Sequence, residues 1–205
     1  MSTENQQMKT IILGGFLGSG KTTTLMQLAR YLVDSSVSDH EYKVVILENE
    51  VGEVGIDDAY LRSGGFSVDN LFSGCACCTV AGELLSAAVR IQHEMNPEWL
   101  IVETTGVAYP RSMQENMKTA NIDTRIVILA DAQRWERLFI PMQGLLRGQI
   151  EGSDAVLVNK IDLVGAETIE RVKSDIAEFE PNTQVFCISA LSPIDDDVWK
   201  SAAGK

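Results

Sequence analysis

The sequence has few basic residues, only two histidines and no long apolar segment. Its 17 lysines and arginines are outnumbered by 29 aspartates and glutamates, giving a formal charge of −12. This balance argues against nucleic acid or an anionic membrane as a partner, because both require a basic surface. No apolar run approaches the roughly 18 residues of a membrane span, and the polar start at residues 1–7 lacks the order of a secretory signal. We therefore expect a cytoplasmic protein.

Cysteine is scarce but concentrated. Three of the four cysteines lie within four residues, as Cys75, Cys77 and Cys78, too close together to pair easily as disulfides. In a reducing compartment such a cluster indicates a metal-binding or redox-active site. Thiolates at the start of a helix favour Zn²⁺, with Co²⁺ nearly as well suited and Fe²⁺ and Ni²⁺ left open. A redox dithiol and incidental thiols are the alternatives. The fourth, Cys187, lies in an apolar run that predicts a buried side chain.

Hydrophobic residues at 45% and charged residues at 22% are typical of a globular protein. The length of 205 residues predicts a single domain over residues 1–205. Short apolar runs alternate with helical periodicity, which predicts an α/β fold around a mostly parallel central sheet of about seven strands. The expected strands are Thr10–Leu13, Lys43–Leu47, Val68–Phe72, Trp99–Val102, Arg125–Ala130, Ala155–Val158 and Gln184–Ile188.

The first motif is a phosphate-binding loop. Residues 15–22, GFLGSGKT, fit the pattern G-x-x-x-x-G-K-[ST] between an expected strand and an expected helix. Its glycines let backbone N–H groups face the β-phosphate, while Lys21 would reach the β- and γ-phosphates and the Thr22 hydroxyl would bind Mg²⁺. The residues predicted to hold the phosphates are Gly15, Gly18, Ser19, Gly20, Lys21, Thr22 and Thr23.

A second motif, Glu103-Thr-Thr-Gly106, follows the apolar run that begins at Trp99. A carboxylate at the end of a central strand is where the acid that supports Mg²⁺ belongs in such folds. We therefore predict that Glu103 supports Mg²⁺. The backbone N–H of Gly106 is a candidate contact to the γ-phosphate.

A third motif indicates which base is bound. Asn159-Lys160-Ile-Asp162 follows an apolar strand near residue 158. The Asp162 carboxylate can accept both the N1–H and the 2-amino group of guanine, which adenine does not offer. Lys160 would lie along the base, and Asn159 would brace the neighbouring loop. Further backbone contacts to the base are expected from Ser189, Ala190 and Leu191. The motif predicts GTP and GDP as the ligands.

The cysteine cluster lies between an acidic segment and the strand that ends at Glu103. Glu50, Glu53 and Asp57 in that segment are candidates for orienting the attacking water or completing the metal shell. A solvated acidic loop explains them equally well. If both flanking segments contact the γ-phosphate region, metal binding and hydrolysis would be coupled through them.

Together these residues resemble the CobW-type GTPases, which are related to the nickel-insertion GTPases of urease and hydrogenase maturation. The resemblance rests on GGFLGSGKTT from Gly14, Asn49-Glu50 with residues 52–57, GCACC from Gly74, Glu103-Thr-Thr-Gly106 and Asn159-Lys-Ile-Asp162. It implies a three-layer P-loop NTPase of the SIMIBI type. Many members carry a second, C-terminal domain and a histidine-rich stretch. This chain is expected to consist of the GTPase domain alone.

The resemblance implies a slow GTPase that acts as a metallochaperone in zinc allocation, cobalamin synthesis or nitrile hydratase maturation. Zn²⁺ or Co²⁺ would be held by Cys75, Cys77 and Cys78 and delivered to a client metalloprotein or corrinoid enzyme. Lys21 and Thr22, with Glu103, Glu50 and Asp57, are the candidate catalytic groups, and a nucleotide-dependent homodimer could supply a missing one. The alternative hypothesis is a docking module gated by the nucleotide, with only a structural metal; a P-loop ATPase or kinase is a weaker third.

Overall fold

The computed structural model describes residues 8–37, 42–48, 66–70 and 80–205. Strands and helices alternate along the chain. The strands are β1 (Lys9–Gly15), β2 (Val44–Glu48), β3 (Phe66–Asn70), β4 (Trp99–Glu103), β5 (Thr124–Asp131), β6 (Ala155–Asn159) and β7 (Gln184–Cys187). The helices are α1 (Lys21–Asp34), α3 (Val80–Glu94), α4 (Pro110–Thr119), α5 (Trp135–Ile150), α6 (Ala166–Phe179) and α7 (Asp196–Ala203), with a short 3-10 helix, η1 (Ile161–Leu163).

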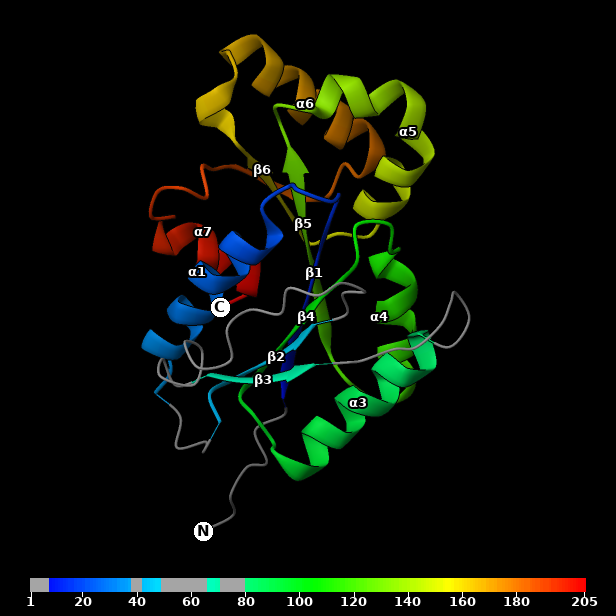
Figure 1. Cartoon of the computed structure of the whole chain (residues 1–205), viewed down its shortest axis with the longest axis vertical. Helices are drawn as coiled ribbons and strands as arrows, with labels where there is room; N and C mark the ends of the chain where they lie inside the picture. Colours follow the sequence, from blue (N-terminus) through cyan, green and yellow to red (C-terminus); the bar gives the residue numbers. More distant parts are fainter. Residues whose placement is uncertain (1–7, 38–41, 49–65, 71–79) are drawn as a thin grey trace.

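The strands form one seven-stranded sheet in the order β3-β2-β4-β1-β5-β6-β7, and every adjacent pair is parallel (Figure 1). This confirms the predicted α/β fold, in which the sheet proves to be wholly parallel. The central strands β1, β4 and β5 are buried almost throughout. Strands covered on both faces are expected to be continuously apolar, which is why these runs could be recognised in the sequence.

Helices cover both faces of the sheet, which gives three layers (Figure 1). On one face α1 and α7 pack through Leu25, Leu28, Leu32 and Trp199 against alternate side chains of the strands. The opposite face is covered by α3 and α4 over β1, β2 and β4, and by α5 and α6 over β5 and β6. Because side chains of a strand alternate between its faces, each central strand contributes to both apolar layers.

The parallel register brings several polar residues to the same edge of the sheet. Glu103 is level with Leu13, just before the phosphate-binding loop, and also with Glu48 at the end of β2. Asp131 at the end of β5 is level with Asn159 at the end of β6. The carboxyl ends of parallel strands meet at one edge, where such folds bind their ligands.

Helix α5 is broken in the middle. Pro141 lies within it, and Met142 has non-helical backbone angles of φ −127° and ψ 19°. Proline removes one helical hydrogen bond and its ring displaces the carbonyl of the preceding turn. The two halves of α5 therefore meet at a kink.

Two sequence predictions need correction. Strand β3 includes Phe66 and Ser67, so it starts before the predicted start at Val68; the predicted end at Phe72 lies outside the described residues. The Cys187 thiol, predicted to be buried, is exposed. It lies at the end of β7, an edge strand whose side chains are at most half-buried. Within the described ranges, no helix is both long enough and apolar enough to cross a membrane.

Candidate functional site

The phosphate-binding loop leaves the end of β1 and leads directly into α1. Its glycines at positions 15, 18 and 20 all have positive φ. At Gly20 φ is 99°, and a Cβ atom there would lie 2.4 Å from Nδ2 of Asn159. Only glycine combines this conformation with so close a neighbour. The loop therefore turns tightly over the end of β6 before α1 begins.

Lys21 and Thr22 occupy the first turn of α1. Lys21 is 7% exposed. The Thr22 hydroxyl donates to Oε1 of Glu103 at 3.4 Å, although the two residues are 81 positions apart. Glu103 itself is buried, at 5% exposure. The amino end of a helix attracts anions, and a hydroxyl beside a carboxylate is a ligand pair suited to Mg²⁺. The arrangement fits a phosphate group and its Mg²⁺ side by side.

A pocket of about 200 Å³ opens beside the loop. Its walls come from the end of the phosphate-binding loop, the first turn of α1 and the segments after β5, β6 and β7. The lining residues are Gly20, Thr23, Gln133, Asn159, Lys160, Asp162, Leu163, Ser189, Ala190 and Leu191. The five residues expected to contact a guanine base thus line one cavity, together with Asn159, which was expected to brace the neighbouring loop. Its mixed apolar and carboxylate walls suit a flat, hydrogen-bonding ring.

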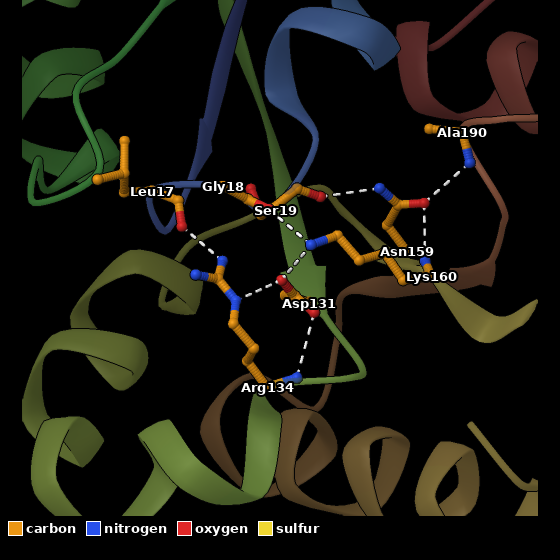
Figure 2. A network of polar contacts seen from close by, with 8 residues as sticks. All are labelled: Leu17, Gly18, Ser19, Asp131, Arg134, Asn159, Lys160 and Ala190. Atoms are coloured by element: carbon orange, nitrogen blue, oxygen red, sulfur yellow. Dashed lines mark hydrogen bonds and ion pairs between the residues drawn. The ribbon is translucent and has the colours of Figure 1, made fainter. Parts of the chain in front are cut away.

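Asn159 joins the three segments around this pocket (Figure 2). Its Nδ2 donates to the carbonyl of Ser19 at 2.8 Å. Its Oδ1 accepts from the backbone N–H of Lys160 at 2.8 Å and from that of Ala190 at 2.9 Å. The side chain is 2% exposed. Asn159 therefore acts mainly within the protein, holding the loops in register, and forms only a small part of the pocket wall.

Gly106 lies against the outer side of the phosphate-binding loop. A Cβ atom at Gly106 would be 2.6 Å from the backbone nitrogen of Leu17. Its carbonyl accepts from Nε2 of Gln149 at 2.9 Å, and Gln149 is almost fully buried in α5. The segment after β4 is thus held between the loop and α5. A displacement of the loop would therefore move this segment, and the segment would in turn move against α5.

Several predicted residues lie outside the described part of the chain. These are Glu50, Glu53 and Asp57 of the acidic segment and Cys75, Cys77 and Cys78 of the cysteine cluster. Among the described residues, no group of three or more histidines, cysteines, aspartates or glutamates could hold a metal ion. The proposed metal-binding cluster therefore stays a prediction from the sequence.

A profile of the nucleotide-binding domain of CobW, HypB and UreG matches residues 9–187. The chain belongs to the CobW/HypB/UreG family of GTPases. The match runs from the start of β1 to the end of β7, so it includes the phosphate-binding loop, Glu103 and Asn159. Family membership and the geometry of the loop thus agree on a nucleotide-binding domain.

The chain shares about a quarter of its residues with each of two curated relatives. The chain is 25% identical to the zinc-regulated GTPase metalloprotein activator 1 of Dictyostelium discoideum, over 88% of this chain and 45% of that protein. It is also 25% identical to the zinc chaperone YjiA of Escherichia coli, over 87% of this chain and 56% of YjiA. The chain therefore spans about half the length of these curated relatives.

Solved structures confirm the fold. The zinc-bound YjiA GTPase from E. coli superposes with a TM-score of 0.65 at 21% identity, over 97% of this chain and 62% of YjiA. The hydrogenase maturation factor HypB from Archaeoglobus fulgidus superposes with a TM-score of 0.64 at 16% identity, over 96% of this chain and 88% of HypB. These likenesses support the three-layer P-loop architecture of a CobW-type domain.

Three polar residues that hold this CobW-type site together were not predicted from the sequence: Asp131, Arg134 and Gln149. Nor were Gln133 and Leu163, which line the pocket. Asp131 had a usable signal, because it follows the apolar run of β5 just as Glu103 follows that of β4. Burial alone would raise the pKa of the Asp131 carboxyl, but hydrogen bonds from Lys160 and Arg134 outweigh burial and lower the pKa below its ordinary value. Arg134 and Gln149 carried no such signal, since nothing in the local sequence says that α5 reaches the loop.

Proposed function

We propose that this chain binds GTP with Mg²⁺, hydrolyses it slowly to GDP and phosphate, and uses the nucleotide state to control Zn²⁺ or Co²⁺ bound at Cys75, Cys77 and Cys78. The observation that carries the nucleotide part is the cavity next to Gly20, lined by Asp162 and the other residues predicted to contact guanine. A base in this cavity would place its phosphates toward the loop and the start of α1.

Recognition of guanine would depend on Asp162. Its carboxylate would accept the N1–H and 2-amino protons of guanine, and adenine would leave it unpaired. Lys160 lies beside the cavity with its Nζ donating to the Gly18 carbonyl at 2.7 Å. This contact supports an aliphatic stem of Lys160 packed along the base. Replacing Asp162 with alanine should therefore lower the affinity for GDP much more than the affinity for ADP.

Hydrolysis would depend on positioning and electrostatics, as in other phosphoryl transfers. Lys21 and the loop N–H groups would neutralise charge on the β- and γ-phosphates. Thr22 and Glu103 would hold Mg²⁺, which supplies further charge neutralisation when bound. The backbone N–H of Gly106 would contact the γ-phosphate. Glu50 and Asp57 are our candidates for orienting the attacking water, whose oxygen forms the new bond to phosphorus as the bond to the β-phosphate oxygen breaks.

The sheet gives a physical basis for coupling the metal to the nucleotide. The acidic segment starts after Glu48, whose backbone is level with Glu103. The cysteine segment starts after Asn70, whose backbone is level with Glu48. Both segments therefore leave the sheet at the edge where Mg²⁺ would bind. A change in contacts around the γ-phosphate would act directly on the segment that carries the cysteines.

The names of the relatives support zinc as the cargo and a client metalloprotein as the partner, with cobalt and a corrinoid enzyme as the alternatives. A reducing cytoplasm would keep the three thiols free to bind metal. The net charge of −12 is our reason for proposing neither nucleic acid nor a membrane as a partner.

A nucleotide-dependent homodimer is part of the proposal. Leu17, Val107 and Tyr109 are 64%, 65% and 50% exposed around the phosphate-binding loop. Apolar side chains beside the phosphate site would be covered if two copies met across it. Sedimentation velocity should then show a dimer with a non-hydrolysable GTP analogue and a monomer with GDP. A monomer in both states would refute this part.

The test of the chaperone cycle is a zinc titration of the full chain without nucleotide, with GDP and with a non-hydrolysable GTP analogue. Coupling between two ligands is reciprocal, so the zinc affinity should differ between the states by the same factor by which zinc changes nucleotide affinity. Cys77→Ser combined with Cys78→Ser should abolish tight zinc binding and leave a folded protein that binds GDP.

Cys187→Ser is the matched control, because this exposed thiol lies on β7, at the opposite edge of the sheet from β3. It should leave zinc affinity unchanged. Equal zinc affinity in all three nucleotide states would remove the proposed cycle. Unfolding of the Cys77/Cys78 variant would instead favour a structural metal and the docking module.

A further inference from the structure

Two residues outside the recognised motifs support the phosphate-binding loop: Arg134 contacts it directly, and Asp131 acts through Arg134 and Lys160. Asp131 is the last residue of β5, and Arg134 is the residue just before α5. The Asp131 carboxylate is 1% exposed. Its Oδ2 accepts from Nε of Arg134 at 2.7 Å and from Nζ of Lys160 at 2.7 Å. Its Oδ1 accepts from the backbone N–H of Arg134 at 3.2 Å. One buried carboxylate therefore orients two cations.

Each of these cations also holds a carbonyl of the loop (Figure 2). The Nη2 group of Arg134 donates to the carbonyl of Leu17. The Nζ group of Lys160 donates to the carbonyl of Gly18 at 2.7 Å. The arginine uses two nitrogens of its planar guanidinium, with Nε donating to Asp131 and Nη2 donating to Leu17. A lysine has no such fixed fork.

The direction of a carbonyl sets the direction of the next N–H group. In a planar trans peptide the two point to opposite sides, so a Leu17 carbonyl turned toward Arg134 leaves the N–H of Gly18 facing away from α5. Gly18 has φ +73°, and a Cβ atom there would lie 3.2 Å from Nη2 of Arg134. The arginine therefore packs directly on the peptide whose orientation it controls.

We propose that Arg134, held by Asp131, is a positioning residue for phosphate binding: it fixes the Leu17–Gly18 peptide so that the Gly18 N–H is presented to the β-phosphate of the nucleotide. This inference rests on the proposed function, since it requires a nucleoside diphosphate or triphosphate bound at the loop. The proposal adds Arg134, at the start of α5, to the site and gives it the task of orienting one peptide of the loop. The positive charge of Arg134 alone does not perform that task.

The test compares Arg134→Gln, Arg134→Lys and wild type in their affinities for GDP and GMP, with GMP measured by competition against a fluorescent GDP analogue. GMP has no β-phosphate, so its binding reports on the base pocket and on folding. Arg134→Gln should weaken GDP binding about tenfold, in line with loss of one charge-assisted hydrogen bond. Its GMP affinity should change less than about twofold, within what an unaffected pocket allows.

Arg134→Lys separates geometry from charge. Lysine keeps the positive charge beside Asp131, but its one Nζ replaces two nitrogens that the guanidinium holds at fixed positions, one at Asp131 and one at Leu17. We expect it to keep the contact with Asp131 and lose the one with Leu17, so it should weaken GDP binding nearly as much as glutamine does. A lysine variant that binds GDP like wild type would show that charge suffices and overturn the proposal. Arg171→Gln is the matched control, because this exposed arginine of α6 pairs with Glu136 of α5 at 3.0 Å, and it should leave both affinities unchanged.

The outcomes also separate this inference from the proposed function. A wild-type chain that does not bind GDP would refute guanine nucleotide binding itself. Tight GDP binding that is unchanged in Arg134→Gln would refute only the role of Arg134. Equal losses of GDP and GMP affinity in both Arg134 variants would show a general effect on folding and would overturn the positioning role.

Discussion

Replacing Asn159 with alanine tests whether the base pocket and the phosphate-binding loop form one structural unit. The substitution removes three hydrogen bonds from a side chain that is 2% exposed. The carbonyl of Ser19 and the N–H groups of Lys160 and Ala190 lose their partner together.

The magnitude follows from these contacts. At about 1 kcal/mol of net stabilisation per hydrogen bond, three bonds correspond to about 3 kcal/mol of unfolding free energy. For a chain of this size each kcal/mol lowers the melting temperature by about 2–4 °C, so a shift of about 6–12 °C is expected. Because the same bonds hold the pocket walls, affinity for GDP should fall as well, by at least about tenfold.

Urea unfolding followed by circular dichroism measures the free energy, and a GDP titration measures the affinity. Asn182→Ala is the control, because Asn182 is exposed after α6, and such a change should alter stability by less than about 0.5 kcal/mol. If Asn159→Ala were as stable as this control, the hydrogen bonds would contribute nothing net. If stability fell and GDP affinity did not, the pocket would be independent of the loop.

Further predictions concern three other positions of the site. Gly20→Ala should lower GDP affinity by at least about tenfold, because its Cβ would lie 2.4 Å from Asn159 Nδ2 at a φ of +99°, whereas Gly165→Ala, with no atom within 4 Å, should have no effect in the same titration. The stability that wild type gains over Asp131→Asn should be constant above about pH 4 and shrink below it, since the folded-state pKa of Asp131 is lowered; urea unfolding that shows a constant difference down to pH 3 would contradict this. Glu103→Gln should raise the Mg²⁺ concentration needed for half-maximal GTP hydrolysis about tenfold, and an unchanged requirement would exclude Glu103 from the Mg²⁺ site.

Much of the fold could be predicted because the sheet is parallel and buried. Continuous apolar runs revealed β1, β4, β5 and β6, whose interior faces leave little room for polar residues. At the edges the signal weakens. Strand β3 lies at one end of the sheet and its start was predicted two residues too late, and Cys187 at the other end was wrongly expected to be buried. An edge strand has a neighbour on one side only, so the hydrophobicity of its residues no longer fixes their burial.

The site could be predicted where function is local in sequence. Lys21 and Thr22 follow directly from the pattern of the loop, and Asn159 from its position after an apolar strand. Arg134 could not be predicted in this way, because its role depends on α5 packing beside the loop, at a carbonyl 117 residues away in the chain. Single-sequence patterns describe neighbours along the chain, whereas this contact exists only after the sheet has formed.

The kink at Pro141 divides α5 into two mechanical parts. Arg134, before the kink, is anchored to the phosphate-binding loop, while Gln149, beyond it, holds the carbonyl of Gly106. A straight helix would transmit any displacement at one end to the other as a lever does. A jointed one would let the segment around Gly106 move with the γ-phosphate of the proposed GTP complex while the loop held by Arg134 kept its shape.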